Sequence, residues 1–154
     1  SEMCIRDRAY LTWGNRECYI VKLKDNMIET EGEVKRIHID ESHPFTEAPW
    51  IHKYNGKYYL TYASEWPEKI AYAVADHIEG PYETKGIISE IAGNSNTTHP
   101  AIVNFKGQWI FISHNGGLTT GTSYSRSVIA EPMEYNADGS IKPIPPTAEG
   151  VKPL

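Results

Sequence analysis

An internal repeat of about 50 residues limits the folds that this chain can adopt. Two stretches align without a gap, Pro49–Ser64 (PWIHKYNGKYYLTYAS) and Pro100–Asn115 (PAIVNFKGQWIFISHN). Each stretch reads as an alternating strand, a two-residue turn and a second strand. The turns, Asn55-Gly56 and Lys106-Gly107, end in glycine, which readily takes the positive φ of a tight hairpin turn. Self-similarity at this period is typical of repeat architectures.

A third copy lies near the start, where Ala9–Trp13 (AYLTW) matches the strand that follows each turn. The pattern predicts further strands at Cys18–Leu23, Ile70–Ala75 and Ser123–Ala130, and more polar fourth strands around Val34–Ile37, Tyr82–Ile87 and Met133–Tyr135. Four strands per repeat predict an all-β fold, a partial β-propeller with about two and a half to three blades of four-stranded antiparallel sheet. Because propellers close with four or more blades, we expect residues 9–154 to be the C-terminal part of a single propeller domain.

The first eight residues, SEMCIRDR, do not follow the repeat. Asp7 stands where the later copies have the turn glycine, and Ser1–Arg8 lacks the alternation expected of the preceding strand. We therefore expect residues 1–8 to be a non-native N-terminal scar.

The composition excludes several classes of partner. The formal net charge of −5 argues against nucleic acid, whose backbone selects basic surfaces. The sequence contains no run of about 18 apolar residues, the length that a membrane-spanning helix needs. The two cysteines, Cys4 and Cys18, are too few to indicate a disulfide framework or a zinc site. The ten tyrosines and four tryptophans suit strands, and they also suit sugar binding, since a ring can stack on a pyranose.

Two chemical groups stand at the heads of successive inner strands. Glu47 precedes one such strand and His99 the next, one repeat further on, so both are expected to face the same axis. Glu47 lies among Phe45, Pro49 and Trp50, and poor solvation there would raise its pKa, as a general acid requires. The residues alone leave open that Glu47 pairs with a base or caps a turn, and that His99 is structural.

Several linked motifs resemble glycoside hydrolase family 43 from about Ala9 to Val151: FTEAPWIHKYNGKYYLTYA, WPEKIAYAVADHIEGPY, NTTHPAIVNFKGQWIFISHN and SRSVIAEPMEYNADGSI. The resemblance implies a five-bladed propeller that cleaves glycans containing arabinose or xylose with inversion. It also implies a base aspartate, a second aspartate that tunes pKa values and an acid glutamate. The acid falls in an E-A-P motif that maps onto Glu47. Neither aspartate maps onto this chain, so we expect the base to lie upstream and the chain alone to be inactive.

The resemblance also assigns substrate contacts. His99 matches a histidine beneath the sugar that, in some members, takes part in a central water or calcium site. Since calcium prefers oxygen ligands, we expect contact through water and assign no metal ligand. No cofactor is expected to be required, although the complete propeller could hold calcium in its central channel. Arg126 matches an arginine that reaches the substrate pocket, and a guanidinium offers donors to sugar hydroxyls. Trp66, in a loop, could stack on a sugar.

The expected partner is an oligosaccharide or polysaccharide, and two other propeller functions compete with hydrolysis. A non-catalytic carbohydrate-binding propeller would keep the aromatic residues and Arg126 but would not need an acid at a strand head. A protein-interaction propeller would carry exposed anchor residues on its faces instead. Upstream sequence with paired aspartates at strand heads would favour the hydrolase, and their absence would favour a binding protein.

Overall fold

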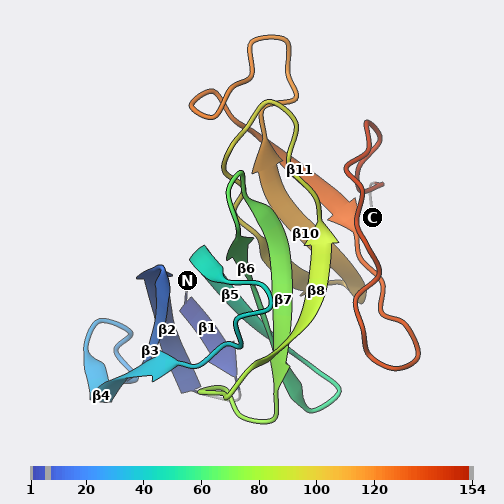
Figure 1. Cartoon of the computed structure of the whole chain (residues 1–154). Helices are drawn as coiled ribbons and strands as arrows, with labels where there is room; N and C mark the ends of the chain where they lie inside the picture. The colour runs from blue at the N-terminus through green and yellow to red at the C-terminus, as the bar shows by residue number, and fades with distance from the viewer. Residues whose placement is uncertain (1, 6–7, 153–154) are drawn as a thin grey trace.

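The computed structural model describes residues 2–5 and 8–152 of the chain. These residues form strands and connecting loops, without a helix (Figure 1). The strands are β1 (Glu2–Ile5), β2 (Arg8–Asn15), β3 (Glu17–Leu23), β4 (Thr30–Ile37), β5 (Phe45–Tyr54), β6 (Lys57–Ser64), β7 (Lys69–Ala75), β8 (Glu83–Ser89), β9 (Ala101–Phe105), β10 (Gln108–Asn115) and β11 (Ser127–Pro132). The predicted all-β class is confirmed.

The strands form three antiparallel groups that follow the repeat. The first runs β1-β2-β3-β4, the second β5-β6-β7-β8 and the third β9-β10-β11. A single residue pair, Asn15 with Glu47, joins β2 of the first group to β5 of the second. We call these groups the first, second and third sheets. Their order and pairing are those of successive propeller blades, so the chain forms a partial propeller.

The two hairpins of the repeat have the same turn. Asn55 and Gly56 have φ values of 46° and 82°, and Lys106 and Gly107 have 50° and 85°. Two consecutive residues with positive φ give a turn whose twist matches that of the flanking strands. The predicted tight hairpins are therefore confirmed in both sheets.

The core lies between the sheets. Alternate side chains of β6 contribute to it on opposite faces of the second sheet. Leu60 and Tyr62 point into a cluster shared with Cys18 and Ile20 of β3. Tyr59 points the other way, into a cluster shared with the third sheet. Successive side chains of a strand face opposite sides, so the middle sheet buries both faces against its neighbours.

Strand β5 forms the inner edge of the second sheet. It contacts β1, β2 and β3 of the first sheet and β9 of the third. Ile51–Tyr54 therefore lies on the inner side, as the repeat predicts.

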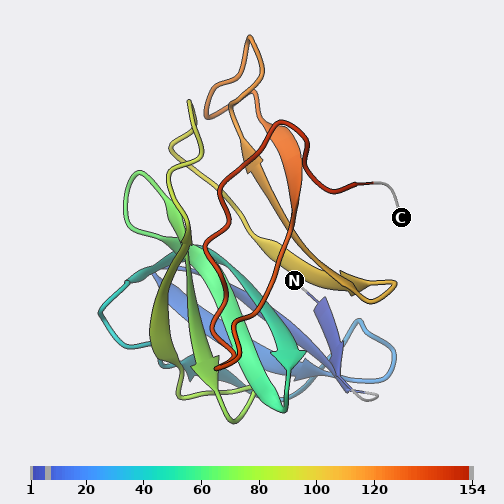
Figure 2. The same cartoon turned by 90° about the vertical axis from the view of Figure 1, so that its right-hand side faces the viewer.

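The third sheet differs from the expected four strands. Its described residues form three, and the predicted strand at Met133–Tyr135 is reduced to one bridge between Tyr135 and Ile141. The chain turns at Asn136–Gly139, where the Gly139 N–H donates to the Asn136 carbonyl. It then runs back along the second sheet, where the Ile144 N–H donates to the Ile88 carbonyl (Figure 2). The prediction fails because this segment packs against the neighbouring sheet instead of extending its own.

Two smaller expectations are also corrected. The strand predicted at Ser123–Ala130 begins only at Ser127, since the residues before it form a loop. Glu2–Ile5, expected to lack a strand, pairs with β2 as β1. Asp7, the expected turn position, lies outside the described residues. The described part of the chain offers no helix that could cross a membrane.

Candidate active site

Glu47 lies in an irregular part of β5. The pairing with β6 shifts register on both sides of Glu47, between Phe45 and Glu47 and again between Glu47 and Trp50. Ala48 between them has a φ of 57°, in the left-handed region. Such bulges locally bend a strand and can redirect a side chain. Here the bulged segment presents the Glu47 carboxylate to a pocket between sheets.

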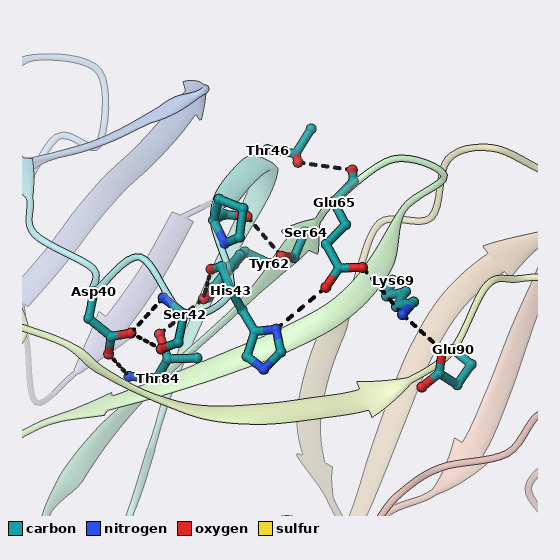
Figure 3. A network of polar contacts seen from close by, with 11 residues as sticks. Asp40, Ser42, His43, Thr46, Tyr62, Ser64, Glu65, Lys69, Thr84 and Glu90 are labelled. Carbon is teal, nitrogen blue, oxygen red and sulfur yellow. Dashed lines mark hydrogen bonds and ion pairs between the residues drawn. The ribbon is translucent and has the colours of Figure 1, made fainter.

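Hydrogen bonds from β6 and the loop after it hold the start of β5 in place (Figure 3). The Tyr62 hydroxyl donates to the His43 carbonyl at 2.8 Å, and the Ser64 hydroxyl to the Pro44 carbonyl at 2.8 Å. The Thr46 hydroxyl donates to the Glu65 carbonyl at 3.2 Å. Buried polar groups bonded to backbone in this way fix a segment's position. The residue before Glu47 is thus anchored.

Glu47 and His99 meet as their spacing predicts. His99 Nε2 lies 2.9 Å from Glu47 Oε1, and the two side chains are 44% and 28% exposed. The second oxygen, Glu47 Oε2, accepts a hydrogen bond from Asn15 Nδ2 at 2.8 Å. A pocket of about 410 Å³ opens beside them, with Trp13 and Trp50 among its lining residues. Asn15 of the first sheet and His99, in the loop before β9, therefore converge on the carboxylate of Glu47 in the second sheet.

The electrostatics of Glu47 differ from the expectation. Partial burial is the largest influence and raises the pKa, but hydrogen bonds from His99 and Asn15 and the charge of His99 lower it. The net pKa of Glu47 lies below its ordinary value. The predicted raised pKa is wrong, because the prediction weighed only the apolar neighbours within β5.

A second carboxyl group, Glu68, was missed by the sequence analysis. It is 1% exposed and lies in the turn just before β7, where its Oε2 accepts a hydrogen bond from the Thr98 N–H at 2.8 Å. A carboxylate oxygen of Glu47, one of Glu68 and a ring nitrogen of His99 lie within 4.8 Å of one another. No local pattern in SEWPEK marks this residue, since Thr98 and Glu47 lie 30 and 21 residues away in the sequence.

Arg126 and Trp66 lie outside the set that lines this pocket. Arg126 Nη1 donates to the Thr97 hydroxyl at 3.4 Å, two residues before His99. Burial, and after it the charges of His99 and Arg126, lower the pKa of His114, whose ring packs edge-on against His99 at a centroid distance of 5.0 Å. Trp66 is 67% exposed in the loop between β6 and β7. Substrate contact by either residue stays a prediction.

The close donor atoms of Glu47, Glu68 and His99 could in principle hold a cation such as calcium. Calcium takes six to eight oxygen ligands, and imidazole is a poor one. Two carboxylates and an imidazole that are already bonded to Asn15, to Thr98 and to each other do not fit it. We therefore assign no calcium site to the described residues.

Comparisons with known proteins extend over most of the chain. A family model described as Glycosyl hydrolases family 43 matches residues 4–141. A β-xylosidase of Xylanibacter ruminicola is 40% identical over 111 residues, which cover 71% of this chain and 34% of that protein. A xylosidase/arabinosidase of Bacteroides ovatus is 34% identical over 150 residues, which cover 88% and 46%. The chain thus spans less than half the length of these relatives.

A solved structure shows the same fold. A β-xylosidase/α-arabinofuranosidase from a compost microbial metagenome, in complex with xylotriose and in a calcium-free form, matches with a TM-score of 0.87 at 27% identity. The match covers 94% of this chain and 56% of that one. The family model over residues 4–141 and the shared fold agree, and the chain belongs to glycosyl hydrolase family 43.

Proposed function

We propose that this chain supplies the general-acid side of an inverting glycoside hydrolase, with Glu47 as the acid. The pairing of Glu47 with His99 beside the pocket carries the proposal. The acid would protonate the departing glycosidic oxygen while a base aspartate upstream activates water on the opposite face of the sugar. In inverting enzymes the two carboxyl groups stand about 6.5–9.5 Å apart, which leaves room for that water.

The substrate we propose is an oligosaccharide or polysaccharide that contains xylose or arabinose. The names of the relatives, β-xylosidase and xylosidase/arabinosidase, support this class. His99 would lie beneath the sugar, and Arg126 and Trp66 would contact it from the adjoining loops. A calcium ion in the central channel of the complete propeller would reach His99 through water, because the side chains themselves offer no suitable ligand set.

One observation favours the alternative, a non-catalytic carbohydrate-binding propeller. The lowered pKa of Glu47 keeps it ionised, and a carboxylate readily accepts hydrogen bonds from sugar hydroxyls. Such a protein would bind xylo-oligosaccharides and leave them intact.

The test uses the complete protein, in which the proposed upstream blades are present. The 154-residue chain is the control. The complete protein is expected to hydrolyse aryl xylosides or arabinofuranosides and to release the inverted anomer, followed by NMR of the product. The 154-residue chain, in which we assign no base aspartate, is expected to show no turnover. Binding without hydrolysis by the complete protein would favour the carbohydrate-binding alternative and contradict the proposal.

A further inference from the structure

The buried carboxyl group of Glu68 has no role in the mechanism proposed above. We propose that Glu68 is a positioning residue for the general acid: it holds the segment that carries His99 and shares a proton with Glu47. This inference rests on the proposed function of Glu47. It adds a second carboxyl group that supplies the acid with its proton in each turnover.

The contacts of Glu68 join two loops. Its N–H donates to the Asn96 carbonyl at 2.9 Å, and its Oε2 accepts from the Thr98 N–H at 2.8 Å. Both bonds reach the residues just before His99. The Glu68 side chain therefore holds the backbone of Thr98 and in this way positions the His99 ring against Glu47.

The two carboxyl groups also lie close together. A side-chain oxygen of Glu47 and one of Glu68 lie within 4.8 Å of each other. Groups this close titrate as a pair, and the doubly ionised state is disfavoured.

The surroundings place the resting proton on Glu68. Burial is the largest influence and raises its pKa, the Thr98 N–H lowers it, and the nearby charge of Glu47 raises it again. The pKa of Glu47, by contrast, is lowered. This division also accounts for the low pKa of a residue that must deliver a proton.

Other charged groups near the pair come from several elements. His99 faces both carboxyl groups, and His114 of β10 stands behind it. Arg126 lies next to the His99 segment through Thr97. Next to Glu68 in the sequence, Lys69 forms ion pairs with Glu65 and Glu90. Among these groups, Glu68 is the carboxyl group that lies within 4.8 Å of Glu47.

The proton movements balance within the proposed reaction. At rest the pair holds one proton, on Glu68. This proton passes to the Glu47 carboxylate, and Glu47 gives it to the glycosidic oxygen as the bond to the anomeric carbon breaks, with the electron pair staying on that oxygen. Solvent returns a proton to Glu68 before the next cycle.

The experiment compares Glu68→Gln with Glu131→Gln in the complete enzyme. Glu131 is a matched control, since it is also 1% exposed and accepts a hydrogen bond from a backbone N–H, that of Thr147, but lies on β11 away from the pair. For Glu68→Gln we expect kcat to fall by about 10- to 100-fold on a substrate with a poor leaving group, with little change in KM. The basic limb of its kcat/KM profile should move to lower pH, because Glu47 then titrates alone. Glu131→Gln should change neither.

Two further measurements separate the possible failures. Glu68→Asp restores a carboxyl group and should return part of the profile. In the wild-type enzyme, carboxyl ¹³C NMR should show Glu47 and Glu68 titrating in two coupled steps, and independent single steps would overturn the inference. An unchanged pH profile in Glu68→Gln would also overturn the inference. The proposed function would still stand in that case if the activity loss of Glu47→Gln depends on the leaving group. If Glu47→Gln loses activity equally on all leaving groups, the proposed function itself fails.

Discussion

Glu47 and Thr98 occupy equivalent positions in successive repeats, 51 residues apart, and they have different roles. Glu47 is partly exposed and lines a pocket, where His99 and Asn15 bond to its carboxylate. Thr98 is 2% exposed, and its N–H and hydroxyl bond to Glu68 and to the His114 carbonyl. The repeat places the backbone of both residues, and the side chain decides which position faces substrate and which supports its neighbour.

The strongest test of this equivalence uses the core. Leu60 and Phe111 are equivalent and both 0% exposed. Alanine at either position should lower the free energy of unfolding by about 2–5 kcal/mol, with Phe111→Ala at the upper end, because a cavity remains. Urea unfolding measures this, and Val128→Ala, on an exposed residue of β11, should change stability by less than about 0.5 kcal/mol. A loss below about 1 kcal/mol for Phe111→Ala would show that the third sheet does not pack as the second does.

A medium effect is expected where the repeats differ. His52 is buried and bonds to the Tyr135 hydroxyl, while its equivalent is Val103. Burial lowers the pKa of His52 from 6.5 to about 3, so the unfolded chain binds its proton more readily between these values. Stability should therefore fall as pH drops below 6.5, by about 2 kcal/mol at pH 5.

The matched variant is His52→Val, which copies the third repeat. Its unfolding free energy should lose less between pH 7 and pH 5 than that of the wild type, measured by urea titration at each pH. His114, whose pKa is lowered to about 4, contributes in the same direction to both proteins. Identical pH dependence in the two would show that His52 is not buried in its neutral form.

The smallest effect concerns the turns. Gly56 and Gly107 have nearly the same positive φ, and an added Cβ would meet nothing within 4 Å at either site. Gly56→Ala and Gly107→Ala should therefore each cost about 1–2 kcal/mol through backbone strain alone. Gly93→Ala, also in open space but without positive φ, is the control and should cost less. Unequal costs in thermal or urea unfolding would show that the two hairpins are not equivalent.

The sequence predicted what depends on local order. The glycines at the turns and the alternation of the hairpins fixed the strands, and the repeat period placed Glu47 opposite His99. Both outcomes follow from periodicity along one chain segment. The third sheet departs from the pattern because residues after Met133 find a better partner in the second sheet.

The sequence did not predict the other partners of Glu47. Asn15 and Glu68 reach it from other sheets and loops, and nothing near either residue marks it as part of a site. The pKa of Glu47 was misjudged for the same reason, since the bonds that lower it cross between repeats. A repeat specifies where each unit lies, while cross-repeat contacts depend on the individual side chains that meet.

The most direct test of the account compares leaving groups in the complete enzyme with Glu47→Gln. This change keeps the shape of the side chain and removes its transferable proton. On a xyloside with a poor leaving group the rate should fall by about 10²–10⁴-fold. On a dinitrophenyl xyloside, whose leaving group departs without protonation, the loss should be much smaller. An equal loss on both substrates would contradict the assignment of Glu47 as the general acid.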